Sequence, residues 1–253
     1  MEKEKLIHTF SGGFSGSKVE LIKTESNKIF VRKTGSVDRN YERMMALYDV
    51  ASVPKVFRKE MDVLDMEYIV GLDMDTYLSY NSIEPLVSFL TEFIQMARKD
   101  TTRKDYTEAY ELAKVVDYDI DFDFSYSQLL EKLPRYLPQT KFYHGDMTLE
   151  NIIYSTPYFV FIDPVQTPFD SWAFDIAKLR QDLESKWFLR HSTSDLTHKL
   201  YNIQRQLLRS FPLAKNDYLL ILMLLRVYRY TEFGSPEANL LQKECNRLWK
   251  QNS

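Results

Sequence analysis

Along the first 70 residues, hydrophobic and polar positions alternate in the way that is typical of β-strands. This pattern predicts strands over Leu6 to Phe10, Lys18 to Lys23, Ile29 to Lys33 and Val63 to Val70. After Asp38 the period lengthens to that of a helix, which ends at Pro54. The apolar stripe of this helix consists of Tyr41, Met44, Met45 and Tyr48.

From Gly71 onward the pattern is largely helical. Helices are predicted over Ile83 to Ala97, Thr107 to Val116, Ser127 to Leu133, Ser171 to Leu183, Asp195 to Ser210, Asp217 to Tyr230 and Glu237 to Trp249. One hairpin interrupts them, with strands over Asn151 to Tyr154 and Tyr158 to Asp163. We therefore expect an α+β protein in which residues 1–70 form a small sheet-rich N-lobe and residues 71–253 form a larger helical C-lobe.

The composition excludes several classes of protein. The 253-residue chain has 33 Lys+Arg against 36 Asp+Glu, a net charge of −3, which argues against a protein that mainly coats nucleic acid or an anionic membrane. Cys245 is the only cysteine, so an intrachain disulfide and a thiolate zinc site are excluded. The N-terminal residues lack the apolar core of a signal peptide, and the longest apolar run, Tyr218 to Leu225, is far shorter than the roughly 20 residues of a bilayer span. We expect a cytoplasmic protein that binds neither nucleic acid nor membrane.

The strongest chemical signal is the segment from His144 to Asn151, which reads His-Gly-Asp-Met-Thr-Leu-Glu-Asn and precedes the hairpin. Asn151 opens the first hairpin strand and Asp163 closes the second, so antiparallel pairing places both at one end of the hairpin. Their oxygens suit Mg²⁺, which completes its shell with water and phosphate oxygens. Phosphoryl transfer needs two such ligands and a separate carboxylate beside the attacking hydroxyl, a role open to Asp146 in the preceding loop. The alternative is that Asp146 and Asn151 are ordinary turn residues and that Asp163 caps the end of a strand.

Two further features are weaker on their own. Gly12, Gly13 and Gly16, with Ser15 among them, lie between two predicted strands, where backbone N–H groups can approach phosphate oxygens. An ordinary hairpin turn explains this segment as well, and its spacing matches neither of the glycine motifs that precede a helix. Lys33 lies on the apolar face of its strand, where an ammonium needs a partner, and Glu42 on the following helix is a candidate. A strand-end lysine that reaches water is the equally favoured alternative.

Together with Asp65-Met-Glu-Tyr-Ile69 and Ile162-Asp163, these residues resemble, in this order, the aminoglycoside phosphotransferase and choline kinase family of small-molecule kinases. The resemblance extends from about residue 8 to about residue 180. It implies a two-lobed protein-kinase-like fold with an antiparallel sheet in the N-lobe. It also implies Mg²⁺-dependent transfer of the γ-phosphate of ATP, or of GTP, to a hydroxyl of a sugar, an amino sugar or an amino alcohol.

The resemblance implies roles for individual residues. Asp146 would be the catalytic base or would orient the hydroxyl, and Asn151 and Asp163 would hold Mg²⁺. Lys33, braced by Glu42, would contact the α- and β-phosphates. The remaining nucleotide contacts would come from the glycine-rich loop and from an interlobe hinge: Gly12, Gly13, Ser15, Gly16, Glu67, Tyr68 and Ile69.

Asp175 lies on the apolar face of its predicted helix, where a carboxylate needs hydrogen-bond donors. In the family an Asp at this position accepts hydrogen bonds from the backbone of the catalytic loop; a first-turn Asp favoured by the helix dipole is the alternative. Gly145 stands where protein kinases carry an Arg, and only 11 residues separate Asp163 from Asp175. These features argue against a protein acceptor regulated by loop phosphorylation. Pro164, directly after Asp163, departs from the family pattern.

Two other functions compete with the kinase. A nucleotide-binding pseudokinase scaffold is disfavoured because Lys33, Asp146, Asn151 and Asp163 are all present. A metal-dependent hydrolase is disfavoured because no second histidine accompanies His144 at ligand spacing. Clues to the acceptor conflict, since the acidic segment from Asp117 to Asp123 suits a cation, whereas Arg226 and Arg229 suit an anion or a sugar. A solvated acidic loop is the favoured alternative for the first segment, and a helix C-terminus that favours cations is the alternative for the second.

Overall fold

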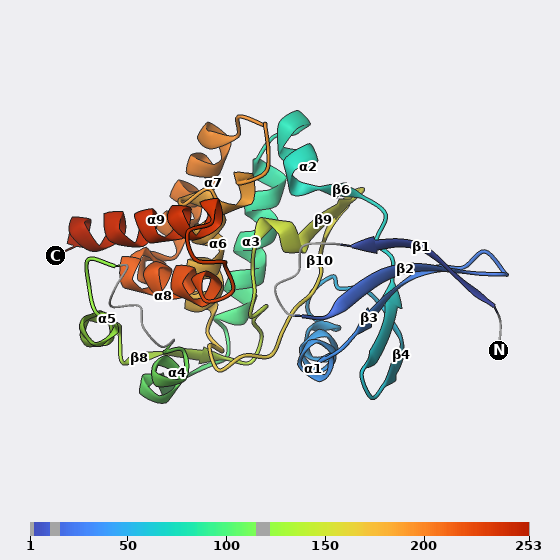
Figure 1. Ribbon diagram of the computed structural model, residues 1–253, viewed down its shortest axis with the longest axis horizontal. Coiled ribbons are helices and arrows are strands. Elements are labelled where there is room, and N and C mark those ends of the chain that lie inside the picture. Colours follow the sequence, from blue (N-terminus) through green and yellow to red (C-terminus); the bar gives the residue numbers. More distant parts are fainter. Residues whose placement is uncertain (1–2, 11–15, 115–121, 253) are drawn as a thin grey trace. The chain divides into compact units, whose positions relative to one another are not determined.

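The computed structural model describes residues 3–10, 16–114 and 122–252. The chain folds into two compact units. The first comprises Met1–Met74 and Asn151–Thr167, and the second comprises Asp75–Glu150 and Pro168–Ser253. A small antiparallel sheet in the first unit and a mostly helical second unit confirm the predicted α+β class (Figure 1).

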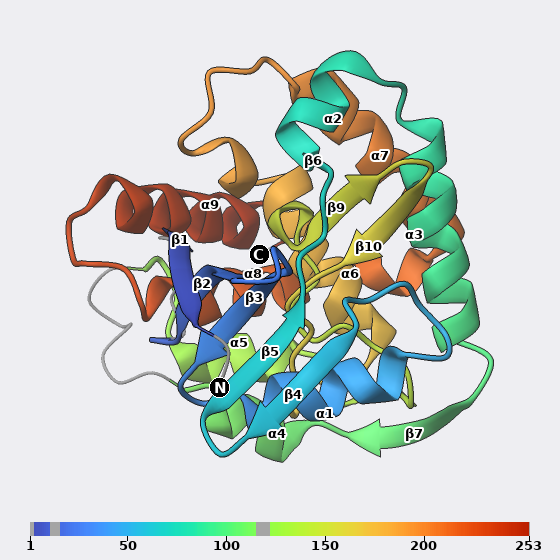
Figure 2. The ribbon, with the colours of Figure 1, turned by 90° about the vertical axis from the view of Figure 1, so that its right-hand side faces the viewer.

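The first unit is built on a five-stranded antiparallel sheet. Its order is β1-β2-β3-β5-β4, so β3 and β5 are central, and Figure 2 shows β5 and β4 side by side. The strands are β1 (Glu4–Phe10), β2 (Lys18–Thr24), β3 (Ile29–Thr34), β4 (Val56–Glu60) and β5 (Val63–Glu67). Helix α1 (Asp38–Leu47) packs on the sheet through Met44, which joins Val37, Leu64 and Met66 in a buried cluster.

Helix α1 buries a different face from the predicted one. Met45 and Tyr48 are exposed, while Asn40, Arg43, Met44 and Leu47 are buried. The apolar pattern misplaces this face because it counts Asn40 as a surface residue. In the structure the side-chain amide of Asn40 is buried and has hydrogen-bond acceptors.

The hairpin belongs to the same unit as the sheet. Strands β9 (Ile152–Ser155) and β10 (Tyr158–Phe161) pair, and β6 (Leu72–Asp73) extends them in the order β10-β9-β6. Gly71 permits this pairing, because a Cβ there would lie 2.4 Å from the carbonyl oxygen of Tyr154. Backbone hydrogen bonds from Phe161 N to Ser52 O and from Gln166 N to Arg39 O tie the hairpin to the segments around α1. The boundary expected from composition placed the hairpin in the C-lobe, whereas these pairings attach it to the sheet-rich unit.

The second unit is a set of helices around α6. The helices are α2 (Met74–Tyr80), α3 (Glu84–Ala97), α4 (Thr107–Leu112), α5 (Tyr126–Lys132), α6 (Trp172–Leu183), α7 (Thr197–Ser210), α8 (Asp217–Tyr228) and α9 (Pro236–Asn252). Short 3₁₀ turns cover Leu149–Asn151, Trp187–Leu189 and Pro212–Lys215, and β7 (Thr101–Asp105) pairs with β8 (Tyr136–Thr140). Every residue of α6 is buried, and α7, α8 and β8 pack against it (Figure 1).

In the described ranges, no helix combines the length and the hydrophobicity that crossing a bilayer requires.

Candidate active site

Lys33 of β3 and Asp163, the second residue after β10, form an ion pair in the first unit. The ammonium nitrogen of Lys33 lies 2.5 Å from Asp163 Oδ1, and the lysine is only 3% exposed. Asn40 Nδ2 donates to the same carboxylate oxygen at 2.9 Å and to Pro164 O at 2.9 Å. A strand of the sheet and helix α1 therefore fix the position of the Asp163 carboxylate together.

The predicted pairing of Lys33 with Glu42 is wrong for this structure. Glu42 is exposed, and among the described residues the ion-pair partner of Lys33 is Asp163. Asn40 points inward because it is one helical turn before Met44 and two turns before Leu47, on the same buried face. Glu42 lies on a different face of the helix and is exposed. Asn40 is a site residue that the apolar pattern missed.

Asp163 has a backbone conformation that is rare for a residue with a side chain. Its φ is +53°, in the left-handed region, and Pro164 restricts it further because the residue before a proline is sterically confined. Non-glycine residues with such strain cluster at functional sites. Its side chain is 46% exposed, so one side of the carboxylate is accessible while Lys33 and Asn40 hold the other.

Asn151 lies at the same end of the hairpin as Asp163. The pairing of Ile152 with Phe161 and the hydrogen bond from Ile162 N to Asn151 O place both residues at one end of the hairpin, as predicted. Neither lies within a strand, because Asn151 ends a 3₁₀ turn and β10 ends at Phe161. Within the described ranges, no three His, Cys, Asp or Glu side chains cluster closely enough to hold a metal. A carboxylate and an amide nevertheless fit Mg²⁺, because that ion takes few protein ligands and fills its shell with water and phosphate.

The predicted glycine-rich loop is described only in part. Gly12, Gly13 and Ser15 lie outside the described residues. Gly16 has φ +71°, and no atom lies within 4 Å of the position that a Cβ would occupy there. This turn therefore requires glycine for its backbone conformation and not for lack of space.

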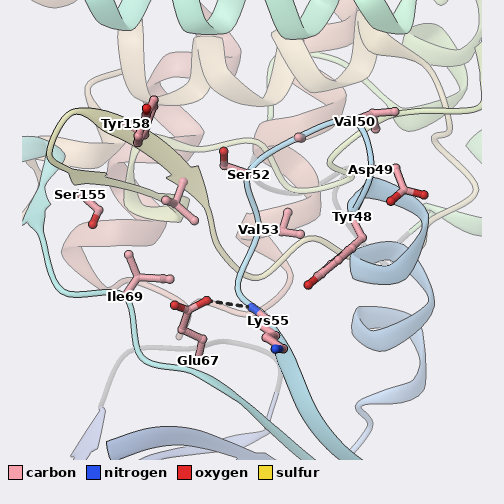
Figure 3. A pocket seen from close by; sticks show the side chains of 12 residues that line it. Tyr48, Asp49, Val50, Ser52, Val53, Lys55, Glu67, Ile69, Ser155 and Tyr158 are labelled. Carbon is pink, nitrogen blue, oxygen red and sulfur yellow. Dashed lines mark hydrogen bonds between the residues drawn. The ribbon is translucent and has the colours of Figure 1, made fainter.

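The predicted hinge, Glu67 to Ile69, begins at the last residue of β5. Its residues Glu67 and Ile69 line a cavity of about 730 Å³, and Figure 3 shows them together with Tyr48, Lys55 and Tyr158, which line it as well. Glu67 Oε2 accepts a hydrogen bond from Lys55 N at 3.1 Å. Of the described residues that line the cavity, none is Lys33, Asn151 or Asp163, so it is separate from the carboxylate site.

The loop that carries Asp146 belongs to the second unit, and a buried carboxylate orders its backbone. Asp175 of α6 accepts hydrogen bonds from His144 N at 2.7 Å and from Gly145 N at 2.8 Å. These are the backbone contacts that were predicted for Asp175. Gly145 has φ +86°, a conformation that a side chain at this position would strain.

The Asp146 carboxylate lies beside a lysine. Lys178 Nζ of α6 is 3.1 Å from Asp146 Oδ1, and the Asp146 side chain remains 37% exposed. Desolvation alone would raise the pKa of Asp146, but the charges of Lys178 and Arg226 outweigh it and hold that pKa below its ordinary value. The carboxylate is therefore ionised at neutral pH and accessible, as an acceptor of a hydroxyl proton must be.

Asp182 holds the other end of the same loop. Its Oδ2 accepts a hydrogen bond from Leu149 N at 2.7 Å, and its Oδ1 is buried with no hydrogen-bond partner in the described part of the chain. Burial, with the nearby charge of Glu150, raises the pKa of Asp182 to about 8. Lys178 and Asp182 were not predicted from the sequence. Their spacing from Asp175, three and seven residues along one helix, is the signal that could have identified them.

The structure thus divides the predicted site between the two units. Gly16, Lys33, Glu42, the hinge, Asn151 and Asp163 belong to the first, and Asp146 belongs to the second.

Comparisons with known proteins support the fold. No protein-family model matches the chain, and no curated protein matches it. Solved structures do match over nearly its whole length. An amicoumacin kinase in complex with AMP-PNP and Ca²⁺ is 12% identical, with a TM-score of 0.59 over 96% of this chain and 88% of that one.

Two choline kinases match to a similar extent. The enzyme from Cryptosporidium parvum is 10% identical, with a TM-score of 0.58 over 98% of this chain and 89% of that one. LicA from Streptococcus pneumoniae is 19% identical, with a TM-score of 0.54 over 97% of this chain and 95% of that one. At this level of identity the similarity establishes architecture. The chain therefore has the two-lobed, protein-kinase-like fold of the small-molecule kinases that its motifs resemble.

Proposed function

We propose that the chain is an ATP-dependent phosphotransferase that moves the γ-phosphate to a hydroxyl of a small molecule. The observation that carries this proposal is the Asp146 carboxylate, which is ionised, accessible and set in a loop whose backbone Asp175 fixes. A carboxylate in this condition can orient an acceptor hydroxyl and take its proton as the phosphoryl group transfers. GTP is the alternative donor.

The first unit would bind the nucleotide. Asp163 and Asn151 would hold Mg²⁺, which neutralises charge on the phosphates when it is bound. Lys33 supplies a cation beside Asp163, and its burial leaves the ammonium dependent on anionic partners. The matched amicoumacin kinase was solved with a nucleotide analogue and a divalent ion, which supports the same donor and ion class here.

Other matched structures support the proposed class of acceptor. The matched structures include kinases of choline, ethanolamine and fructosamine, which supports a small hydroxylated acceptor such as an amino alcohol, a sugar or an amino sugar.

The test is ATP consumption with Mg²⁺ across a panel of these acceptors, for the parent protein and for Asp146→Asn. We expect one acceptor to stimulate turnover in the parent and not in the variant. Tight binding of Mg-ATP without turnover on any acceptor would favour the scaffold function instead.

A further inference from the structure

Helix α6 presents a polar stripe to the loop that carries Asp146. Asp175, Lys178 and Asp182 are spaced three and four residues apart, so they share one face of the helix. In chain order they contact successive parts of the loop: Asp175 the amides of His144 and Gly145, Lys178 the carboxylate of Asp146, and Asp182 the amide of Leu149. One fully buried helix therefore contacts the loop along most of its length.

Lys178 is the member of this stripe that forms an ion pair with Asp146. Its own side chain is 10% exposed, so the methylene stem is packed inside the unit and the ammonium has little water to replace a lost partner. The loop from His144 to Asn151 contains no lysine or arginine. The ammonium that contacts Asp146 is therefore supplied by helix α6 and not by the loop itself.

We propose that Lys178 is a positioning residue for phosphoryl transfer, which holds the Asp146 carboxylate anionic and correctly directed. This inference rests on the proposed function for its effect on turnover, but not for its effect on Asp146 itself. A carboxylate on two rotatable bonds whose side chain is 37% exposed can take several orientations, and a fixed ammonium at 3.1 Å favours one of them. Misplacement of a reacting group by about 1 Å can lower a rate by about a hundredfold.

The charges around Asp146 determine what the loss of Lys178 does. Burial raises the pKa of Asp146, whereas Lys178, Arg226 on α8 and His144 on the same loop lower it. Asp175 and Asp182 on α6 are the acidic neighbours of Lys178 on its own helix face. Lys178 is the largest of the lowering influences, so its removal should raise the pKa of Asp146.

The experiment compares Lys178→Met, which keeps the length and packing of the stem, with Lys178→Arg, which keeps the charge. For Lys178→Met we expect kcat to fall by about tenfold or more, a range set by loss of orientation, with the KM for ATP within a few-fold of the parent. The acid limb of the kcat/KM pH profile should move to higher pH. Lys178→Arg should retain the parent's pH profile. Lys250→Met is the matched control, since that lysine is exposed and pairs with Asp123, which is not part of the loop.

A second readout needs no turnover. The carboxyl ¹³C shift of Asp146, followed against pH in the intact protein, should report a higher pKa in Lys178→Met than in the parent. If Lys178→Met does not fold, Lys178→Gln replaces it, since it also removes the charge but keeps a polar side chain. We expect the same rise in the pKa of Asp146. An unchanged titration of Asp146 in both variants would overturn the proposal. If the parent protein transfers phosphate to no acceptor, that result counts against the proposed function alone. The titration of Asp146 would still show whether Lys178 acts on its carboxylate.

Discussion

The ammonium of Lys33 lies 2.5 Å from the Asp163 carboxylate, so a buried cation of the sheet is neutralised by a residue just after the hairpin. This pair joins a central strand of the sheet to the predicted metal ligand. The carboxylate keeps an accessible side, where a divalent ion and phosphate oxygens can approach. Nucleotide phosphates offer the Lys33 ammonium alternative anionic partners, as the proposed function requires.

Lys33→Met should weaken the binding of Mg-ATP, because the variant keeps the apolar stem of Lys33 and loses its charge. An ion-paired hydrogen bond is worth about 1.5–3 kcal/mol, so the Kd should rise by roughly ten- to hundredfold. Isothermal titration calorimetry measures this directly. Lys59→Met, which removes a lysine that pairs with Asp38 in the same unit, is the control and should bind as the parent does.

Asp163→Asn should weaken Mg²⁺-dependent nucleotide binding and abolish turnover, because the amide keeps the shape of the carboxylate and loses the charge that holds the ion. The decisive comparison is nucleotide affinity with and without Mg²⁺. The parent should gain affinity on addition of the ion, and the variant should gain little. Normal turnover in the variant would show that Asp163 is not the metal ligand.

Asn40 and Glu42 provide a test of the corrected contact on α1. Asn40→Ala leaves the buried Pro164 carbonyl without this donor, which should destabilise the protein by about 1–3 kcal/mol. Glu42→Ala changes an exposed side chain and should alter stability by less than about 0.5 kcal/mol. Urea unfolding of both variants measures the difference. Equal destabilisation by the two substitutions would contradict the assignment of Asn40, and not Glu42, as the residue that makes the buried contact.

Asp182 should make stability fall as the pH rises. Its pKa is raised to about 8 in the folded protein, above the ordinary value of an aspartate, so the folded state binds a proton that the unfolded state has lost. This contribution is complete below about pH 4 and is lost through the window up to about pH 8.

Asp182→Asn keeps an oxygen for the amide of Leu149 and does not ionise. Its free energy of unfolding, relative to that of the parent, should therefore increase between about pH 5 and about pH 8, by an amount on the order of a few kcal/mol. Unfolding of both proteins at the two pH values gives the answer, and a constant difference would mean that Asp182 ionises normally.

The sequence was most informative where a residue pattern has a single physical interpretation. Strict alternation predicted β2 and β3 almost to their ends, and helical periodicity predicted α3, α6 and α7. It missed β4, β6, β7 and β8, since these strands are short or rich in exposed and charged residues and do not carry an apolar face.

The site shows the same limit. Asn151 and Asp163 lie at the same end of the hairpin. This could be predicted, because it follows from antiparallel pairing of two strands that are close in the sequence. The partner of Lys33 could not be predicted, because Asp163 is 130 residues away in the sequence. Whether Asn40 or Glu42 points inward depends on how α1 is rotated about its own axis, which the apolar pattern did not determine. Lys178 was missed for a related reason, since a charged residue in a helix is usually assigned to the solvent face.

The central claim is that Asp146 acts on the hydroxyl in the transition state and not on the nucleotide. Asp146→Asn keeps the shape of the side chain and removes its charge and basicity. General-base steps contribute about 10²–10⁴-fold, so kcat should fall at least about a hundredfold, and kcat/KM with it. The measurement pairs turnover on the responsive acceptor with Mg-ATP affinity by calorimetry. We expect turnover to be lost and the affinity for Mg-ATP to stay within a few-fold of the parent. Turnover close to that of the parent, or loss of nucleotide binding, would contradict this role of Asp146.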